Sequence, residues 1–265
     1  MLGEEFVAEC EALDCLVRDL GEADFARVTD FYGWTVRDQV MHLLFLDEVT
    51  YTAIEDEKSF LAMLAEIRAY QRDVGELSQF MRERYADDGS GALADAWRAG
   101  FHRLGRLFSH RDPKARMKWF GPDMSLRSAA SARQMETWAH GQDLYDLFGV
   151  VRPVGARIRN ICDLGVRTFG WSFVNRELGI PEAPTVELAA PGGELWRWEG
   201  SGGLLSGPAA DFAAVITQRR NVADTALRCD GEAASRWMEI AQCFAGAPSD
   251  APPPGRGPLL VEDEI

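Results

Sequence analysis

Apolar residues recur three and four positions apart through most of the first 150 residues, and this spacing favours amphipathic helices. Thr35 followed by Asp38 resembles the capping box that begins many helices, with Asp in place of the usual Glu or Gln. The pattern predicts helices over residues 4–20, 35–55, 57–84, 91–109 and 125–148. Gly75 is expected to interrupt the third of these. Amphipathic helices of this number and length pack as a bundle.

The pattern changes after Pro153, where short strand-like runs alternate with helical segments. The strands are expected at residues 185–189, 194–199 and 226–229, and the helices at residues 154–178, 208–220 and 231–244. Alternation of this kind indicates a small α/β or α+β domain.

The last segment, residues 246–265, is rich in Pro and Gly and has no periodicity, which is typical of a loose tail. The predicted fold class is therefore α+β. A helical bundle is expected in residues 1–150, a smaller α/β domain in residues 151–246 and a flexible tail in residues 247–265.

The composition of the chain limits which binding partners and which cell compartment are expected. The chain has 265 residues, is 46% hydrophobic and carries a formal net charge of −14, so it can bury a full core but repels phosphate backbones. The negative charge predicts that no nucleic acid is a partner. No membrane partner is expected, because no apolar run approaches the roughly 20 residues that span a bilayer.

The acidic N-terminus does not resemble a signal peptide, so a cytoplasmic location is expected. The five cysteines have no CxxC spacing, which argues against a disulfide framework or a thiolate zinc site.

The histidines offer a candidate metal site. Glu136 and His140 stand four residues apart on a predicted helix, which places them on one face with Cβ atoms roughly 6 Å apart. His42 lies among apolar residues and is expected to point into the bundle or a pocket. Two histidines and one carboxylate form a catalytic zinc set that leaves one coordination position open, and they also match the iron facial triad. On spacing alone, most pairs of this kind are solvated hydrogen bonds, and a lone buried histidine such as His42 is more often a core residue than a ligand.

Two segments carry a resemblance that links these residues. Residues 33–43 (GWTVRDQVMHL) and 136–143 (ETWAHGQD) resemble the two signature stretches of the mycothiol-dependent maleylpyruvate isomerase group, part of the DinB-like metalloprotein superfamily. Residues 223–227 and 240–246 are similar to the C-terminal domain of that group. The resemblance implies a DinB-like four-helix bundle followed by a smaller α/β domain. It also implies that His42, Glu136 and His140 bind the metal.

Further residues are candidates for the same site. Asp143 shares a helix face with His140 and is expected either to orient that histidine or to be exposed. Arg133 is expected to hold Glu136 or a substrate anion, or to form a surface ion pair. The resemblance implies that a C-terminal-domain arginine faces the metal pocket and binds a substrate carboxylate, and Arg219 and Arg220 are the candidates. Their alternative role is to place positive charge at the end of a helix.

Four aromatic residues near the two signature stretches and the loop before the last helix of the bundle are expected either to wall the cavity or to pack in the core. They are Trp34, Trp119, Phe120 and Trp138.

The function that the resemblance implies is a metal-dependent isomerase or transferase that uses a thiol cofactor such as mycothiol. Zinc is the expected metal, with other divalent ions as alternatives, and the expected substrate is a small carboxylate-bearing electrophile. The thiol would add to a double bond and leave after rotation, or would stay attached. A metal-containing binding or sensing module without turnover and a thiol-independent hydrolase are the alternatives. The sequence leaves monomer and dimer open.

Overall fold

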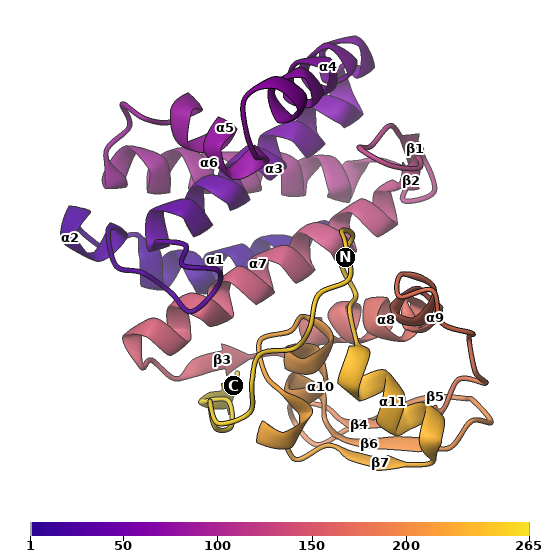
Figure 1. The fold of residues 1–265 in the computed structure, drawn as a ribbon. Coiled ribbons are helices and arrows are strands. Elements are labelled where there is room, and N and C mark those ends of the chain that lie inside the picture. Colours follow the sequence, from indigo (N-terminus) through magenta and orange to yellow (C-terminus); the bar gives the residue numbers. More distant parts are fainter. Residues whose placement is uncertain (1, 265) are drawn as a thin grey trace. The chain divides into compact units, whose positions relative to one another are not determined.

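The computed structural model describes residues 2–264, which divide into two compact units with the boundary between Leu147 and Phe148 (Figure 1). The first unit is helical and the second combines helices with a small sheet, so the predicted α+β class is confirmed. Over this range no helix has both the length and the apolar character that a membrane crossing would require.

The first unit is built on helices α1, α3, α6 and α7. Helix α6 packs along both α1 and α3, while α4 and α5 pack against α3. A short hairpin, β1 (Arg116–Met117) with β2 (Met124–Ser125), leads into α7. The helices are α1 (Leu2–Val17), α2 (Glu22–Phe25), α3 (Val36–Glu55), α4 (Glu57–Asp73), α5 (Leu77–Arg84), α6 (Ser90–His110) and α7 (Leu126–Phe148). The predicted break near Gly75 separates α4 from α5.

The start of α3 is fixed by the capping box that the sequence predicts. The Asp38 backbone N–H donates to Thr35 Oγ1 at 3.2 Å, and the Thr35 backbone N–H donates to Asp38 Oδ2 at 2.9 Å. Arg82 of α5 adds a donor, with its Nε 2.7 Å from Asp38 Oδ1. Burial of Asp38 opposes its ionisation, but these hydrogen bonds outweigh it and lower the pKa of the carboxyl. The capping box fixes the residue at which α3 begins. This start determines the direction in which each side chain of the first two turns points.

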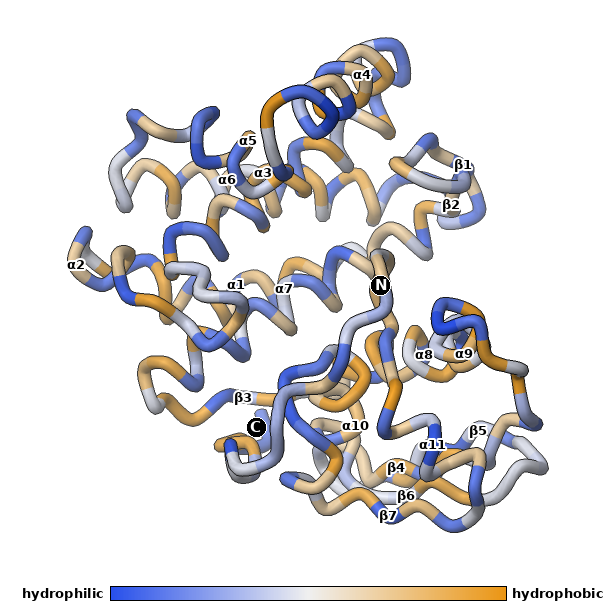
Figure 2. The backbone as a smooth tube through the Cα atoms, viewed as in Figure 1, coloured by the Kyte–Doolittle hydropathy of each residue, from blue (hydrophilic) through white to orange (hydrophobic). Residues whose placement is uncertain are grey.

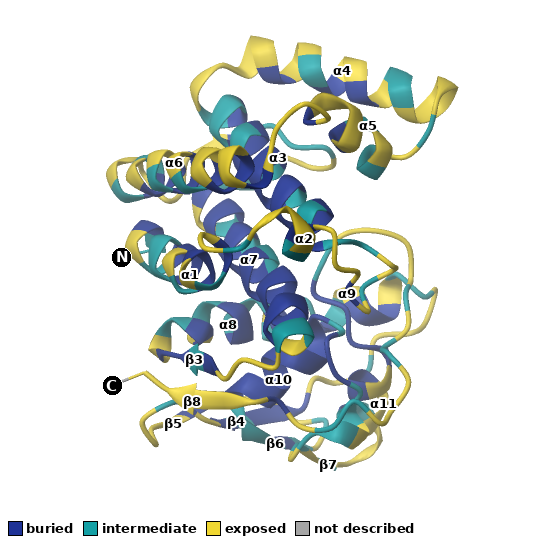
Figure 3. Ribbon diagram, turned by 90° about the vertical axis from the view of Figure 1, so that its left-hand side faces the viewer, coloured by how far each residue is buried: buried dark blue, intermediate teal, exposed yellow. Residues whose placement is uncertain are grey.

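Helix α7 is buried along most of its length (Figure 3). It nevertheless carries hydrophilic residues among its apolar ones (Figure 2). Its buried polar residues include Arg133, Gln134, Thr137, His140, Gln142 and Asp143. Polar side chains are costly to bury without partners, and in α7 the partners come both from the helix itself and from neighbouring helices.

The second unit contains a four-stranded sheet of order β5-β4-β6-β7, in which β4 and β6 are parallel and the other pairs antiparallel. Helix α10 packs on β4 and β6. The elements of this unit are β3 (Arg152–Val154), η1 (Ala156–Ile158), α8 (Arg159–Arg167), α9 (Phe169–Val174), β4 (Thr185–Ala189), β5 (Leu195–Trp198), β6 (Leu204–Pro208), α10 (Ala209–Ile216), η2 (Val222–Asp224), β7 (Arg228–Asp230), α11 (Glu232–Ile240) and β8 (Val261–Asp263).

Helix α10 ends four residues earlier than the sequence predicts. Gln218 adopts a left-handed conformation with φ of 58°. The N–H of Arg219 bonds to Ala214 O and the N–H of Gln218 bonds to Val215 O, which is the pattern of a Schellman motif. The prediction missed this end because glycine is the usual residue at such a position.

Residues 247–260 contain no helix or strand, but the short strand β8 follows them, and the flexibility expected of this segment stays a prediction. Strand β8 pairs in parallel with β3, in a register that places Val261 opposite Arg152. Side chains from the loop after α10 hold the preceding segment: Asn221 Nδ2 donates to Pro252 O at 3.0 Å, and Asp224 Oδ1 accepts from the Gly255 N–H at 2.9 Å. Pairing between segments about a hundred residues apart leaves no local periodicity, so no sequence pattern indicates it.

We predict that Thr35→Ala lowers the free energy of unfolding of the first unit by about 1 kcal/mol, because it removes the side-chain cap of α3. Thr52→Ala is the matched control on the same helix. The Thr52 hydroxyl donates only to Glu48 O one turn back, so its loss should change stability by less than about 0.5 kcal/mol. Urea unfolding followed by circular dichroism measures both. Equal losses in the two variants would contradict a special role for the cap.

Candidate metal centre

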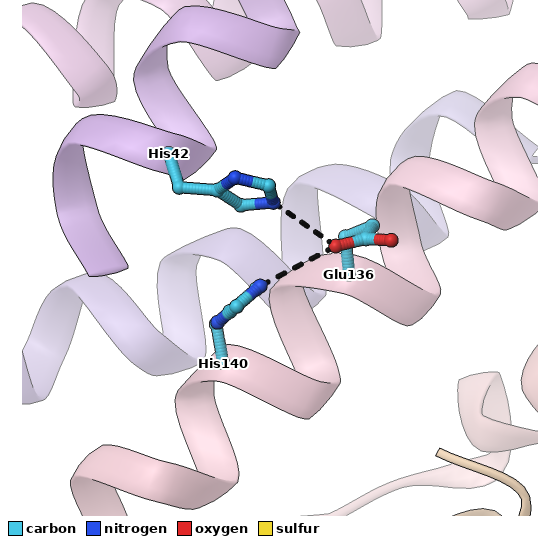
Figure 4. Close-up of side chains that lie close together, drawn as sticks. All are labelled: His42, Glu136 and His140. Carbon is cyan, nitrogen blue, oxygen red and sulfur yellow. Dashed lines mark hydrogen bonds and ion pairs between the residues drawn. The ribbon is translucent and has the colours of Figure 1, made fainter. Parts of the chain in front are cut away.

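Three potential metal ligands converge between α3 and α7 (Figure 4). His42 comes from the second turn of α3, and Glu136 and His140 lie one turn apart on α7. The Nε2 atoms of His42 and His140 lie 3.1 Å and 3.4 Å from the same carboxylate oxygen, Glu136 Oε2. One ligand atom from each residue lies within 4.8 Å of the other two. The predicted grouping of these residues is therefore present in the structure.

The contacts around His140 define which of its nitrogens carries the proton. Gln39 Nε2 donates to Thr29 Oγ1 at 3.0 Å and to Asp143 Oδ2 at 3.4 Å, so the amide oxygen of Gln39 faces His140 Nδ1 and accepts from it. A neutral His140 then carries its proton on Nδ1, and the lone pair of Nε2 points at the Glu136 carboxylate. A proton between Nε2 and Glu136 Oε2 makes the hydrogen bond between the two side chains, and in the neutral histidine a metal ion can take the place of that proton. The donor set thus fits a divalent metal ion.

Glu136 is in the ionised form that a ligand requires. Burial opposes ionisation, but hydrogen bonds with His140 and His42 outweigh it and hold the pKa of the carboxyl well below its ordinary value. The resulting set of two imidazole nitrogens and one carboxylate oxygen suits zinc and several other divalent ions.

Aromatic rings enclose the two histidines. The Trp34 ring stacks on His140 with a centroid separation of 5.8 Å and an interplanar angle of 7°, and it meets His42 edge-on at 5.4 Å. Phe31 meets His140 edge-on at 5.0 Å. Of the four aromatic residues singled out in the sequence, Trp34 is therefore the one that borders the site.

The other three aromatic candidates have packing roles. Trp119 and Phe120 pack on Phe60 of α4, with ring centroids 6.3 Å and 6.2 Å away. Trp138 is buried on α7.

Arg133 makes a contact that the sequence did not predict. Its Nε lies 2.8 Å from Asp47 Oδ1 of α3, and both side chains are almost fully buried. The pair therefore joins α3 to α7 one turn from Glu136, and the surface ion pair expected as an alternative is wrong. Burial raises the pKa of Asp47 despite the opposing effect of the Arg133 guanidinium.

Asp143 is buried and lies close to His140, with Oδ2 3.9 Å from Nδ1. That separation exceeds a hydrogen bond, and Gln39 bridges the two. Neither Gln39 nor Thr29 was singled out in the sequence, where a glutamine next to a capping box carries no signal of its own.

Arg219 and Arg220 lie in the second unit, just beyond α10, and both are buried. Arg219 donates to Thr217 O at 2.7 Å, and Arg220 donates to Gly257 O and Arg219 O, each at 2.9 Å. Arg220 thus supports the C-terminal segment. Binding of a substrate carboxylate by either arginine stays a prediction.

A helical bundle that brings two histidines and a glutamate together from neighbouring helices defines a class of candidate metalloproteins. A family model described as the mycothiol maleylpyruvate isomerase N-terminal domain matches residues 6–145, more than half of the chain. The chain belongs to this family, which confirms the resemblance seen in the signature segments.

Individual relatives agree with the family match. Two uncharacterized proteins of Mycobacterium tuberculosis, from the strains CDC 1551 / Oshkosh and H37Rv, are each 40% identical over 253 residues, covering 94% of this chain and 95% of theirs. A crystal structure of the mycothiol-dependent maleylpyruvate isomerase is similar in fold, with a TM-score of 0.52 and 14% identity, over 83% of this chain and 90% of that one. The likeness therefore extends beyond the helical unit.

We predict that Arg133→Met destabilises the metal-free protein by about 3–5 kcal/mol, because it leaves Asp47 buried without its ion-pair partner. The double variant Arg133→Met/Asp47→Leu should recover most of this loss, since no uncompensated charge remains. Arg72→Met, which breaks the exposed Arg72–Asp73 pair, is the control and should cost less than about 1 kcal/mol. Urea unfolding measures all three. A double variant as unstable as Arg133→Met would contradict the explanation.

Proposed function

We propose that this chain is a metal-dependent enzyme that uses a low-molecular-weight thiol, such as mycothiol, in isomerisation or S-transfer on a small carboxylate-bearing electrophile. The observation that carries the proposal is the convergence of His42, Glu136 and His140 in a chain of the mycothiol maleylpyruvate isomerase family. Zinc is the metal we favour, because a His₂Glu set is typical of catalytic zinc.

The number of ligands and the partial exposure of two of them support catalysis over a purely structural metal. Structural zinc sites are closed by four protein ligands, whereas catalytic sites use three and keep one position open. Only three candidate ligands cluster here within the described chain. The side chains of Glu136 and His42 remain 25% and 14% exposed, so a molecule from solvent can reach the ligand set.

The chemistry divides between the metal and the protein. A divalent metal held by these residues would lower the pKa of a thiol or water in the open position. Glu136 contributes negative charge, His42 and His140 contribute neutral nitrogen donors, and Trp34 and Phe31 cover the His140 ring and limit its contact with water.

The substrate carboxylate is assigned to Arg219 or Arg220 on the family resemblance. Arginine binds carboxylates through two parallel hydrogen bonds, a geometry that lysine does not reproduce. Arg219→Lys and Arg220→Lys separate the two candidates: the residue that binds substrate should raise KM for the carboxylate substrate while metal content stays unchanged. If neither variant changes KM, the assignment is wrong.

We predict that the protein as purified with zinc holds about one equivalent per chain, as a single ligand cluster implies. The zinc content should fall far below one equivalent per chain in each of the variants His42→Ala, His140→Ala and Glu136→Ala. His102→Ala is the matched control, because His102 is a partly exposed histidine of α6 in the same unit. Metal analysis after dialysis measures all four. Full zinc occupancy in His42→Ala would sink the site assignment.

Turnover distinguishes the proposed reaction from its alternatives. The zinc-loaded protein is incubated with maleylpyruvate, with and without mycothiol, and both compounds are followed. Isomerisation converts the substrate without consuming thiol, and S-transfer consumes the two in equal amounts. Turnover without thiol would replace the proposal with a hydrolase. If a panel of carboxylate-bearing electrophiles gives no turnover while zinc is bound, a binding module replaces it.

A further inference from the structure

We propose that Gln39 is a positioning residue for the metal site: it accepts the Nδ1 proton of His140 and so keeps the lone pair of Nε2 directed at the metal position. The inference rests on the proposed function, because it assumes that His140 is a metal ligand. It assigns to a glutamine the orienting role that the sequence suggested for Asp143.

Gln39 is suited to this role by its place in the helix. It is completely buried on α3, one turn before His42, so one helix supplies both a ligand and the support for another ligand on α7. The capping box at Thr35 fixes the first turn of α3 and therefore the direction in which Gln39 points.

The amide of Gln39 has a fixed orientation. Its nitrogen donates to Thr29 Oγ1 at 3.0 Å and to Asp143 Oδ2 at 3.4 Å. Thr29 in turn donates to Trp34 O at 2.8 Å, so its hydroxyl proton is used elsewhere and its oxygen must accept. With both amide protons engaged by acceptors, the Gln39 oxygen is the group that meets His140 Nδ1.

The arrangement also holds Trp34. Thr29 binds the Trp34 carbonyl through its hydroxyl and, at 2.7 Å, through its backbone N–H. The Trp34 ring stacks on His140, so the imidazole is held along its edge by Gln39 and on its face by Trp34. A ligand histidine whose outer nitrogen is fixed in this way loses little freedom when it binds metal, and removing such a partner typically weakens metal binding about 10- to 100-fold.

The test is the apparent dissociation constant for Zn²⁺, measured on the full chain by competition with a chromophoric chelator. Gln39→Leu should weaken Zn²⁺ binding about 10- to 100-fold. In the double variant Gln39→Glu/Asp143→Asn, an acceptor for His140 Nδ1 is retained and the introduced asparagine can donate to it, but the donor to Thr29 is lost, so binding should be stronger than in Gln39→Leu without reaching the wild-type value. Gln142→Leu is the matched control, because it removes a buried glutamine of α7 whose amide donates to Asp146.

Unfolding of the metal-free proteins, measured in parallel, separates positioning from stability. Gln39→Leu and Gln142→Leu each remove a buried hydrogen bond and should both destabilise, but only the first should weaken Zn²⁺ binding. If Gln39→Leu does not fold, Thr29→Val replaces it and should weaken Zn²⁺ binding in the same direction, because it frees the Gln39 amide.

Three results would overturn the inference. The first is wild-type affinity in Gln39→Leu, or in Thr29→Val where that variant replaces it. The second is a larger loss in Asp143→Asn than in Gln39→Leu, which would make the carboxylate the true partner of His140. The third is a wild-type protein that binds no Zn²⁺, a result that would refute the metal site itself and remove the basis of the inference.

Discussion

The burial of polar side chains on α7 is the constraint on which the helical unit depends. Some find a partner within α7, and the partners found on α3 determine how the two helices align: Arg133 pairs with Asp47, and His140 pairs with Gln39. Hydrophobic packing tolerates small shifts between helices, whereas a buried ion pair and an ordered amide do not. His42 and Glu136 lie between these two attachments, so their approach follows from the same alignment.

This arrangement also explains why the site tolerates a carboxylate and two imidazoles in one place. Glu136 keeps a quarter of its side chain exposed, while His140 is buried and supported from behind. A rigid ligand on one side and partly exposed ligands on the other favour a metal that is held firmly yet remains accessible. The buried cluster costs stability, and the binding energy of the metal would offset that cost.

Local features were predicted from the sequence and long-range contacts were not. Thr35 and Asp38 predicted the start of α3, and helical spacing predicted that Glu136 and His140 share one face of a helix. The link to His42 came from the resemblance of two segments, because spacing cannot relate residues nearly a hundred positions apart. For the same reason, the Gln39–His140 contact and the pairing of β8 with β3 were not predicted. The early end of α10 was missed because a non-glycine residue occupies its left-handed position.

The most direct test of the central claim is X-ray absorption spectroscopy at the zinc edge, on the zinc-loaded, thiol-free wild-type protein. A site built from these three residues should give a shell of nitrogen and oxygen ligands, with outer-shell scattering from two imidazole rings and no sulfur. Loss of one imidazole contribution is expected in His140→Ala. Sulfur ligands, or a spectrum without imidazole scattering, would contradict a site built from His42, Glu136 and His140.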